Sequence, residues 1–203
     1  LFGGYLGGRF LSNRNLFVGG MLLQVLGCGT MAVGTVDTMY LGLALFLTGS
    51  GLNVTCINMM LTQRFAPADL RRESAFFWNY AGMNVGFFVG FAVAGHYQLT
   101  KDYTSLFLFA TVGNFLAIVL AAFNWRVLAD SNTRLLEATP RQYTIRFVAG
   151  VAILVGLVPI VWFMLQRAGS TATLFKALAA ALVMGFFYLA LTHRDPRERN
   201  NMW

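Results

Sequence analysis

Charged residues are scarce in this sequence. They make up 11% of its 203 residues, whereas 57% are hydrophobic and the mean hydropathy is +0.62. A soluble domain carries roughly a quarter charged residues. The composition therefore excludes an ordinary soluble fold and indicates an integral membrane protein.

Acidic residues are absent from the long apolar stretches, and all eight lie in the loops beside them. No pair of carboxylates, cluster of metal ligands or nucleophile with a neighbouring base stands out. The two cysteines, Cys28 and Cys56, lie in the middle of separate apolar stretches, and we interpret them as small buried apolar residues. The sequence thus predicts neither an enzyme nor a metal or cofactor site.

Six apolar stretches are long enough to cross a bilayer, which takes about 20 helical residues. They are continuous rather than alternating, and this excludes the strands of a membrane barrel. The predicted fold class is an all-α polytopic membrane protein with six transmembrane helices. The six stretches are residues 15–36, 39–63, 75–97, 104–125, 146–166 and 171–192.

Basic residues are concentrated in alternate loops. Of the 15 lysines and arginines, 12 lie in loops on one side of the predicted helices, and the other side holds Lys101, Arg167 and Lys176. The positive-inside rule places the basic loops in the cytoplasm. The net charge of +7 therefore reflects membrane orientation and not nucleic-acid binding, because no basic patch stands on a soluble fold.

The longest loop, residues 126–145, contains Pro140 and a short amphipathic run that we expect to lie along the membrane surface. We also expect Pro159 to kink the helix that follows. The chain begins with Leu1, and its first residues look like the end of another helix, so we expect a fragment of a larger, transporter-sized chain. The predicted parts are a bundle at 1–125, a cytoplasmic linker at 126–145, a helical hairpin at 146–192 and a cytoplasmic lead into a further helix at 193–203.

The helix predicted over residues 75–97 has two unlike faces. Gly82, Gly86 and Gly90 recur at every fourth position, a spacing that allows close helix packing in membranes. Tyr80 and Asn84 lie on the opposite side. An unpaired amide in hydrocarbon costs several kcal/mol, so Asn84 must face protein or a wet cavity. Two interpretations stay open: a hydrogen bond to another helix without a transport role, or a place in a substrate cavity.

The helix predicted over 39–63 is polar on more than one side, with Asn53 and Asn58 among its polar residues. Such a helix is normally surrounded by protein or water. On the helix before it, Gly20, Gly27 and Gly34 recur every seven residues, which favours close packing over a binding site.

Three segments together resemble one family. "GGYLGGRFLSNR" (3–14) is similar to the loop motif G-x-L-A-D-R-x-G-x-R of the major facilitator superfamily, written GG-x-LADR-x-LG-x-R in its proton-dependent oligopeptide transporter branch. "GSGLNVTCIN" (49–58) and "RRESAFFWNYAGMNVGFF" (71–88) resemble that branch's signatures on its fourth and fifth helices. The segments follow in the family's order and at its spacing. The resemblance implies that the chain runs from the end of helix 2 through helix 6 to the start of helix 7.

The resemblance also implies a function. The protein would import di- or tripeptides, or similar small solutes, with protons by alternating access, as a multi-pass protein of a bacterial inner membrane. Its partners would be the lipid bilayer, the substrate and possible coupling protons, with no nucleic acid and no cofactor. The residues expected to bind substrate are Asn84, Tyr80, Asn53 and Asn58. The cytoplasmic gate motif retains Gly4, Arg9 and Arg14, and the stripe Gly82, Gly86 and Gly90 is expected to pack against a helix of the other half.

The sequence also departs from the family pattern. Gly8 stands at the place of the loop aspartate, and Val54 stands at the place of a lysine that helps to bind the peptide carboxylate and to couple protons. These losses favour two alternatives, a non-transporting membrane subunit or scaffold and a major facilitator transporter of another solute. The pair at 146–192 fits the extra hairpin of bacterial peptide transporters or, alternatively, helices 7 and 8 of a twelve-helix member.

Overall fold

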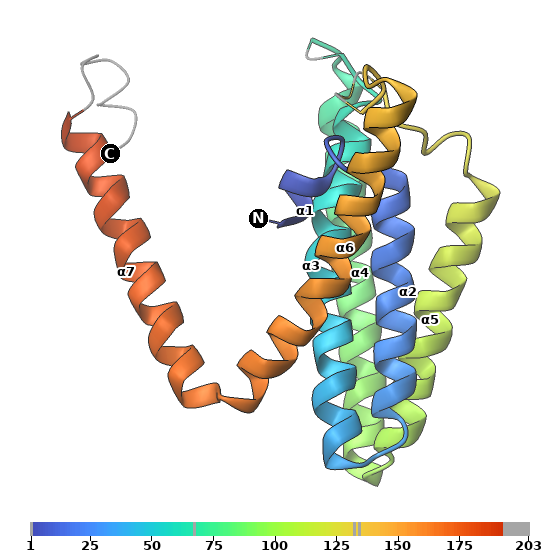
Figure 1. The fold of residues 1–203 in the computed structure, drawn as a ribbon. Helices are drawn as coiled ribbons and strands as arrows, with labels where there is room; N and C mark the ends of the chain where they lie inside the picture. Colours follow the sequence, from blue (N-terminus) through green and yellow to red (C-terminus); the bar gives the residue numbers. More distant parts are fainter. Residues whose placement is uncertain (1, 67, 132, 134, 193–203) are drawn as a thin grey trace. The chain divides into compact units, whose positions relative to one another are not determined.

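The computed structural model describes residues 2–192 apart from 67, 132 and 134, and the described secondary structure is helical (Figure 1). The predicted lead at 193–203 lies outside the described residues. The chain divides into two compact units, Leu1–Trp162 and Phe163–Trp203. The division falls inside a helix, and the predicted linker at 126–145 belongs to the first unit.

Each of the six predicted apolar stretches corresponds to a helix, and a short helix precedes them. The helices are α1 (Phe2–Leu6), α2 (Asn13–Met31), α3 (Val36–Thr62), α4 (Arg71–Thr100), α5 (Tyr103–Phe123), α6 (Pro140–Gln166) and α7 (Ala168–Thr192). Among the described residues, α3, α4, α5 and α6 are long and apolar enough to cross a membrane. The protein is therefore a polytopic membrane protein, with four such helices where the sequence predicted six.

The polar content of α2 explains part of this difference. Its 19 residues include Asn13, Arg14, Asn15 and Gln24, and these lower its mean hydropathy. In α7 the apolar run found among the described residues is Ala179–Tyr188, which is shorter than a span.

Side-chain caps at the helix ends account for the sharp turns of the first unit. The Ser12 hydroxyl accepts the backbone N–H of Asn15 at the start of α2. Thr35 and Thr38 form a capping box at the start of α3, and Asp102 accepts the N–H of Ser105 at the start of α5. Such caps satisfy the N–H groups that lack partners in the first helical turn.

The closest helix contact in the first unit joins α2 and α3 through glycines. A Cβ placed on Gly27 would lie 2.7 Å from the carbonyl O of Gly42, and a Cβ on Gly42 would lie 2.7 Å from the carbonyl O of Gly27. One heptad away, Gly20 and Gly49 make the same kind of backbone contact. Small residues at an interface allow this approach. The packing predicted for Gly20 and Gly27 is confirmed.

The third glycine of that series has a different place. Gly34 lies in the turn after α2, with a φ of +80°, and nothing stands within 4 Å of a Cβ placed on it. The prediction that Gly34 continues the packing stripe is wrong, because α2 ends at Met31 and the chain reverses there. Glycine suits the turn because it adopts positive φ at no steric cost.

Helix α4 lies at the edge of the first unit. All of its residues are described and none is buried. Trp78, Phe88 and Phe91 are each exposed over about three quarters of their surface. An apolar helix with no buried residue needs lipid or further protein to cover it.

Candidate functional site

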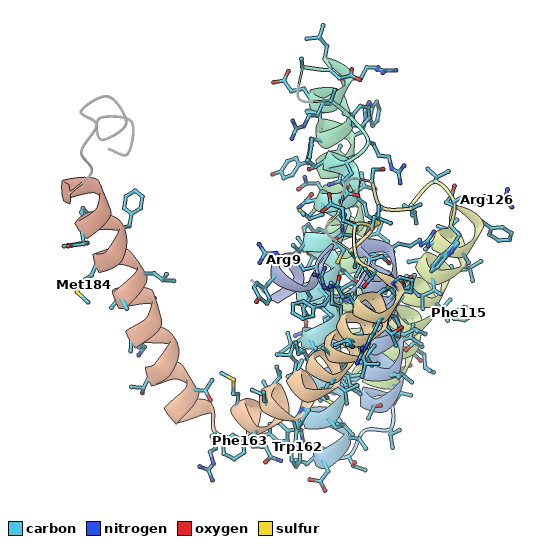
Figure 2. The ribbon with its side chains drawn as sticks, turned by 45° about the horizontal axis from the view of Figure 1, so that its top comes forward. Arg9, Phe115, Arg126, Trp162, Phe163 and Met184 are labelled. Carbon is cyan, nitrogen blue, oxygen red and sulfur yellow. The ribbon has the colours of Figure 1, made fainter. Side chains whose placement is uncertain are left out.

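The basic loops of the first unit gather at one end. The described residues of 7–14, 63–72 and 124–141, which leave out 67, 132 and 134, lie at this end. Helices α2, α4 and α6 begin there, and α3 and α5 return to it (Figure 1). We call it the arginine-rich end. Arg9 and Arg126, which both lie in these loops, are exposed (Figure 2). The turns at 32–35 and 101–102 lie at the opposite end.

The segment 7–12 forms a compact turn between α1 and α2. The N–H of Gly7 donates to the carbonyl of Gly3, and the N–H of Gly8 donates to the carbonyl of Leu11 at 2.8 Å. Gly8 has a φ of +71°. A Cβ on Gly8 would also lie 3.2 Å from Cγ2 of Thr133, so the turn leaves no free room for a side chain where the family motif has an aspartate.

The two arginines of the gate motif differ in their surroundings. The Arg14 guanidinium donates from Nη1 to the carbonyl of Trp125 at 2.7 Å, and its Cζ lies 4.0 Å from the centre of the Trp125 ring. It thereby links the start of α2 to the end of α5. Arg9 is exposed and lies over the ring of Tyr5, with its Cζ 5.1 Å from the ring centre. Gly4, the third gate residue, lies on α1 with Cγ2 of Thr55 3.4 Å from a Cβ placed on it.

The segment that follows α5 lies at the arginine-rich end, and its described residues, 124–131, 133 and 135–139, form no helix. It contacts the bundle at several points, and its position along the membrane surface stays a prediction. Leu135 is buried and Thr133 is 8% exposed. The contacts with α2, α3 and the 7–12 turn are Asn13 N–H to Asp130 Oδ2 at 2.8 Å, Arg64 to the Ala129 carbonyl, Ser131 N–H to Gln63 Oε1 at 3.2 Å, and Leu135 N–H to the Gly8 carbonyl at 3.0 Å.

Tyr80 and Asn84 share one exposed face of α4. Tyr80 is 66% exposed, and the amide of Asn84 donates to the carbonyl of Tyr80 at 2.8 Å. This hydrogen bond is internal to α4 and does not join two helices. It leaves the amide oxygen and one N–H available to a ligand.

Asn53 and Asn58 lie on α3, away from Tyr80 and Asn84. Asn53 is 4% exposed and lies between α2 and α3, where its Oδ1 occupies the space that a Cβ on Gly20 would need. That position suits interhelical packing. Asn58, five residues along α3, is exposed. The four predicted substrate residues therefore form no single cluster in the first unit.

The glycine stripe of α4 is open. Nothing lies within 4 Å of a Cβ placed on Gly82, Gly86 or Gly90. The described residues therefore supply no helix that packs on this stripe, and the predicted partner remains a prediction.

A cavity of about 450 Å³ lies between α2, α3, α4 and α5 toward the arginine-rich end. Its walls are mostly apolar and include Phe17, Met60 and Leu120, while Arg64, Asn79 and Asn124 add polar atoms. None of the predicted substrate residues is among those that line it. It is thus separate from the exposed face of α4.

Electrostatics at the start of α4 involve one ion pair. The Arg71 guanidinium donates to both oxygens of Asp69, at 3.1 and 2.8 Å, and the Arg71 N–H donates to Asp69 Oδ1 at 2.9 Å. These hydrogen bonds lower the pKa of the Asp69 carboxyl below its usual value, because they favour the charged form. The pKa of Asp102 is lowered in the same way by its hydrogen bond from Ser105.

Sequence reasoning missed the residues that hold the arginine-rich end together. Asp130, Thr133 and Trp125 lie in a turn-forming segment without periodicity, which gives no signal of its partner. Ser12 was detectable, because a serine just before a helix is a common cap.

Comparisons with known proteins place this geometry in context. No family model matches the chain. A peptide transporter of Yersinia enterocolitica, YePEPT, is 28% identical over 121 residues, which cover 58% of this chain and 24% of that protein. Dipeptide and tripeptide permease A of Citrobacter koseri is 24% identical over 187 residues, 91% of this chain and 37% of that protein. The permease A of Salmonella typhi is 25% identical over 123 residues, 60% of this chain and 25% of that protein.

These matches confirm the predicted resemblance to peptide transporters. The three relatives carry the names of transporters and permeases and not of enzymes. The matched part of the chain spans between 24% and 37% of the length of these relatives.

Proposed function

We propose that this chain, a relative of bacterial peptide transporters, forms part of a secondary transporter that moves di- or tripeptides, or similar small solutes, by alternating access. The observation that carries the proposal is the similarity to the named peptide permeases, which extends over 91% of the chain in one case. In such transporters the substrate lies near the bilayer midplane, between two units that rock against each other.

The exposed face of α4 supplies the best candidates for substrate contact. Asn84 and Tyr80 lie on it, and Asn58 adds an exposed amide on α3. We assign Asn53 to the contact between α2 and α3, where it is buried against Gly20. A helix from the other half of the transporter would pack on the open stripe Gly82, Gly86 and Gly90, because small residues permit close approach.

The membrane arrangement within this proposal has six spans. Helices α2 and α7 would cross the bilayer together with the four helices that meet the criteria of length and hydropathy. The arginine-rich end would face the cytoplasm of a bacterial inner membrane, with residues 1–125 as a bundle, 126–145 as a cytoplasmic linker and 146–192 as a hairpin. Arg9 and Arg14 would serve the gate there.

Proton coupling is the most specific part of the proposal. Val54 stands where the family has a lysine, and its side chain is 53% exposed. An aliphatic side chain takes up no proton. Coupling therefore requires ionisable groups elsewhere in the transporter, and uptake measured with and without a proton gradient decides whether it occurs.

The experiment is uptake of a labelled dipeptide and tripeptide panel into vesicles that carry the whole transporter of which this chain forms part. Asn84→Ala is expected to lower uptake per folded molecule about tenfold, as the loss of one good hydrogen bond to a charged substrate group would. Val89→Ala is the matched control, because Val89 is an exposed residue of α4 about 140° around the helix from Asn84. No uptake of any peptide by the unmodified transporter would refute peptides as its substrate.

A second candidate is a membrane subunit that transports nothing. The observation that favours it is the amide of Asn84, which bonds to its own helix, together with the valine at position 54. In that case the peptide panel gives no uptake while the protein still folds and inserts.

A further inference from the structure

The start of α2 has an acidic partner that comes from far along the chain. The backbone N–H of Asn13, the first residue of α2, donates to Oδ2 of Asp130 at 2.8 Å, across 117 residues of sequence. The first N–H groups of a helix have no partner inside the helix and carry partial positive charge. A carboxylate is therefore the most favourable acceptor at this place.

Asp130 belongs to a segment that touches three elements at once. We call residues 125–131, 133 and 135 the strap. It contacts the start of α2 through Asp130, the end of α3 through Ser131, and the 7–12 turn through Leu135. Each element begins or ends at the arginine-rich end, so the strap fixes their mutual positions there.

The 7–12 turn is shaped to receive the strap. Thr133 packs against Gly8, where a Cβ would lie 3.2 Å from its Cγ2, and the positive φ of Gly8 disfavours any side chain. The turn thus has no carboxylate of its own beside α2. The carboxylate comes from the strap.

The strap also covers polar atoms that it does not satisfy. Asn13 is fully buried, and neither atom of its amide has a hydrogen-bond partner among the described residues. The same holds for Oδ1 of Asp130 and for the hydroxyl of Thr133. Burying polar groups without partners is costly, and water satisfies them when the cover lifts.

We propose that Asp130 is a positioning residue, whose carboxylate latches the strap onto the start of α2. It thereby holds the 7–12 turn with Arg9 and the start of α2 with Arg14 in one arrangement, and it releases them when the arginine-rich end opens. The opening motion belongs to the proposed function, on which this part of the inference rests. The latch itself is a property of the chain that is measured without transport.

The reporter for the latch is a cysteine in the strap. Thr133→Cys places a thiol at a position that is 8% exposed and whose hydroxyl has no partner, so the substitution removes little. The rate of its reaction with a membrane-impermeant maleimide measures how often the strap opens. The unmodified chain gives the background, because Cys28 and Cys56 are both buried.

Asp130→Ala in the reporter chain is expected to raise the labelling rate about fivefold or more, the usual effect of losing a side-chain acceptor at a helix start. Asp130→Asn, which keeps a carbonyl acceptor without the charge, is expected to give an intermediate rate. Asp102→Ala is the matched control, since Asp102 also caps a helix, with a 3.0 Å bond from Ser105, but lies away from the strap.

Two results overturn the latch. One is a labelling rate in Asp130→Ala equal to that of the reporter chain. The other is an equal rise in Asp102→Ala, which reports general loosening. If Asp130→Ala does not fold, the Asp130→Asn chain decides in the same way. Peptide uptake is scored separately, so an inactive transporter with a working latch and an active one without it are told apart.

Discussion

Gly27 of α2 and Gly42 of α3 are in backbone contact. A Cβ placed on either glycine would lie 2.7 Å from the carbonyl O of the other. Gly27→Ala is therefore expected to force the helices apart, at a cost of about 1–3 kcal/mol typical of overpacking. Thermal unfolding in detergent, followed by circular dichroism, measures the change.

Gly29→Ala is the control for that substitution. Gly29 is on the same helix, and nothing lies within 4 Å of a Cβ placed on it. Its replacement should leave the melting temperature unchanged or raise it, because alanine is favoured over glycine in a helix by about 1 kcal/mol. Equal melting of the two variants would contradict the close contact.

The open stripe of α4 leads to the opposite expectation in the isolated chain. Gly86→Leu meets no neighbour among the described residues, so the melting temperature of the 203-residue chain should not fall. In a transporter whose other half packs on this stripe, the same substitution should lower folded yield or uptake. A fall in stability of the 203-residue chain alone would show that the stripe is already covered.

Membrane orientation follows from the placement of the loops. Glu137 and Thr100 are both exposed and suit single-cysteine substitutions. Glu137 lies just before α6, which begins at the arginine-rich end, and Thr100 is the last residue of α4, at the opposite end. An impermeant thiol reagent added outside intact cells should label the cysteine at Thr100 and spare the one at Glu137, since the arginine-rich end is expected in the cytoplasm. Equal labelling from outside would exclude this topology.

The ion pair at the start of α4 predicts a pH dependence. Arg71 lowers the pKa of Asp69 in the folded chain through its hydrogen bonds. The stabilisation is therefore complete above the unfolded-state pKa of about 4 and is lost as the pH falls through the lower folded-state pKa. Melting temperature is measured from pH 6 downward, and Asp69→Asn should flatten part of the curve. Asp102 has a pKa lowered in the same direction, so Asp69→Asn/Asp102→Asn should flatten more. An unchanged curve in both variants would refute the assignment.

The helices themselves were predictable from the sequence because bilayer thickness dictates apolar runs of a fixed length. The stretch 75–97 became α4 at Arg71–Thr100, extended at its start, where the N–H of Arg71 donates to Asp69 Oδ1. The seven-residue spacing of Gly20 and Gly27 predicted close packing correctly, because small residues at that interval stay on one helix face.

The arrangement around the candidate site was not predictable to the same extent. An asparagine in a span must face protein or water, but which of the two depends on another helix. Asn53 faces protein, because Gly20 has no side chain and leaves space for the Asn53 amide. The contact between Asn13 and Asp130 had no sequence signal, since neither residue belongs to a periodic pattern that includes the other.

The two glycine pairs of α2 and α3 also restrict how these helices can move. Gly20 faces Gly49 and Gly27 faces Gly42, so both pairs are set by one antiparallel register. A slide along the helix axis would have to cover about 10 Å, seven residues at 1.5 Å each, before glycine met glycine again. Shorter slides bring side chains against backbone. Sliding of α2 along α3 by several ångströms is thereby disfavoured, and in the proposed transport cycle we expect the two helices to move as one body.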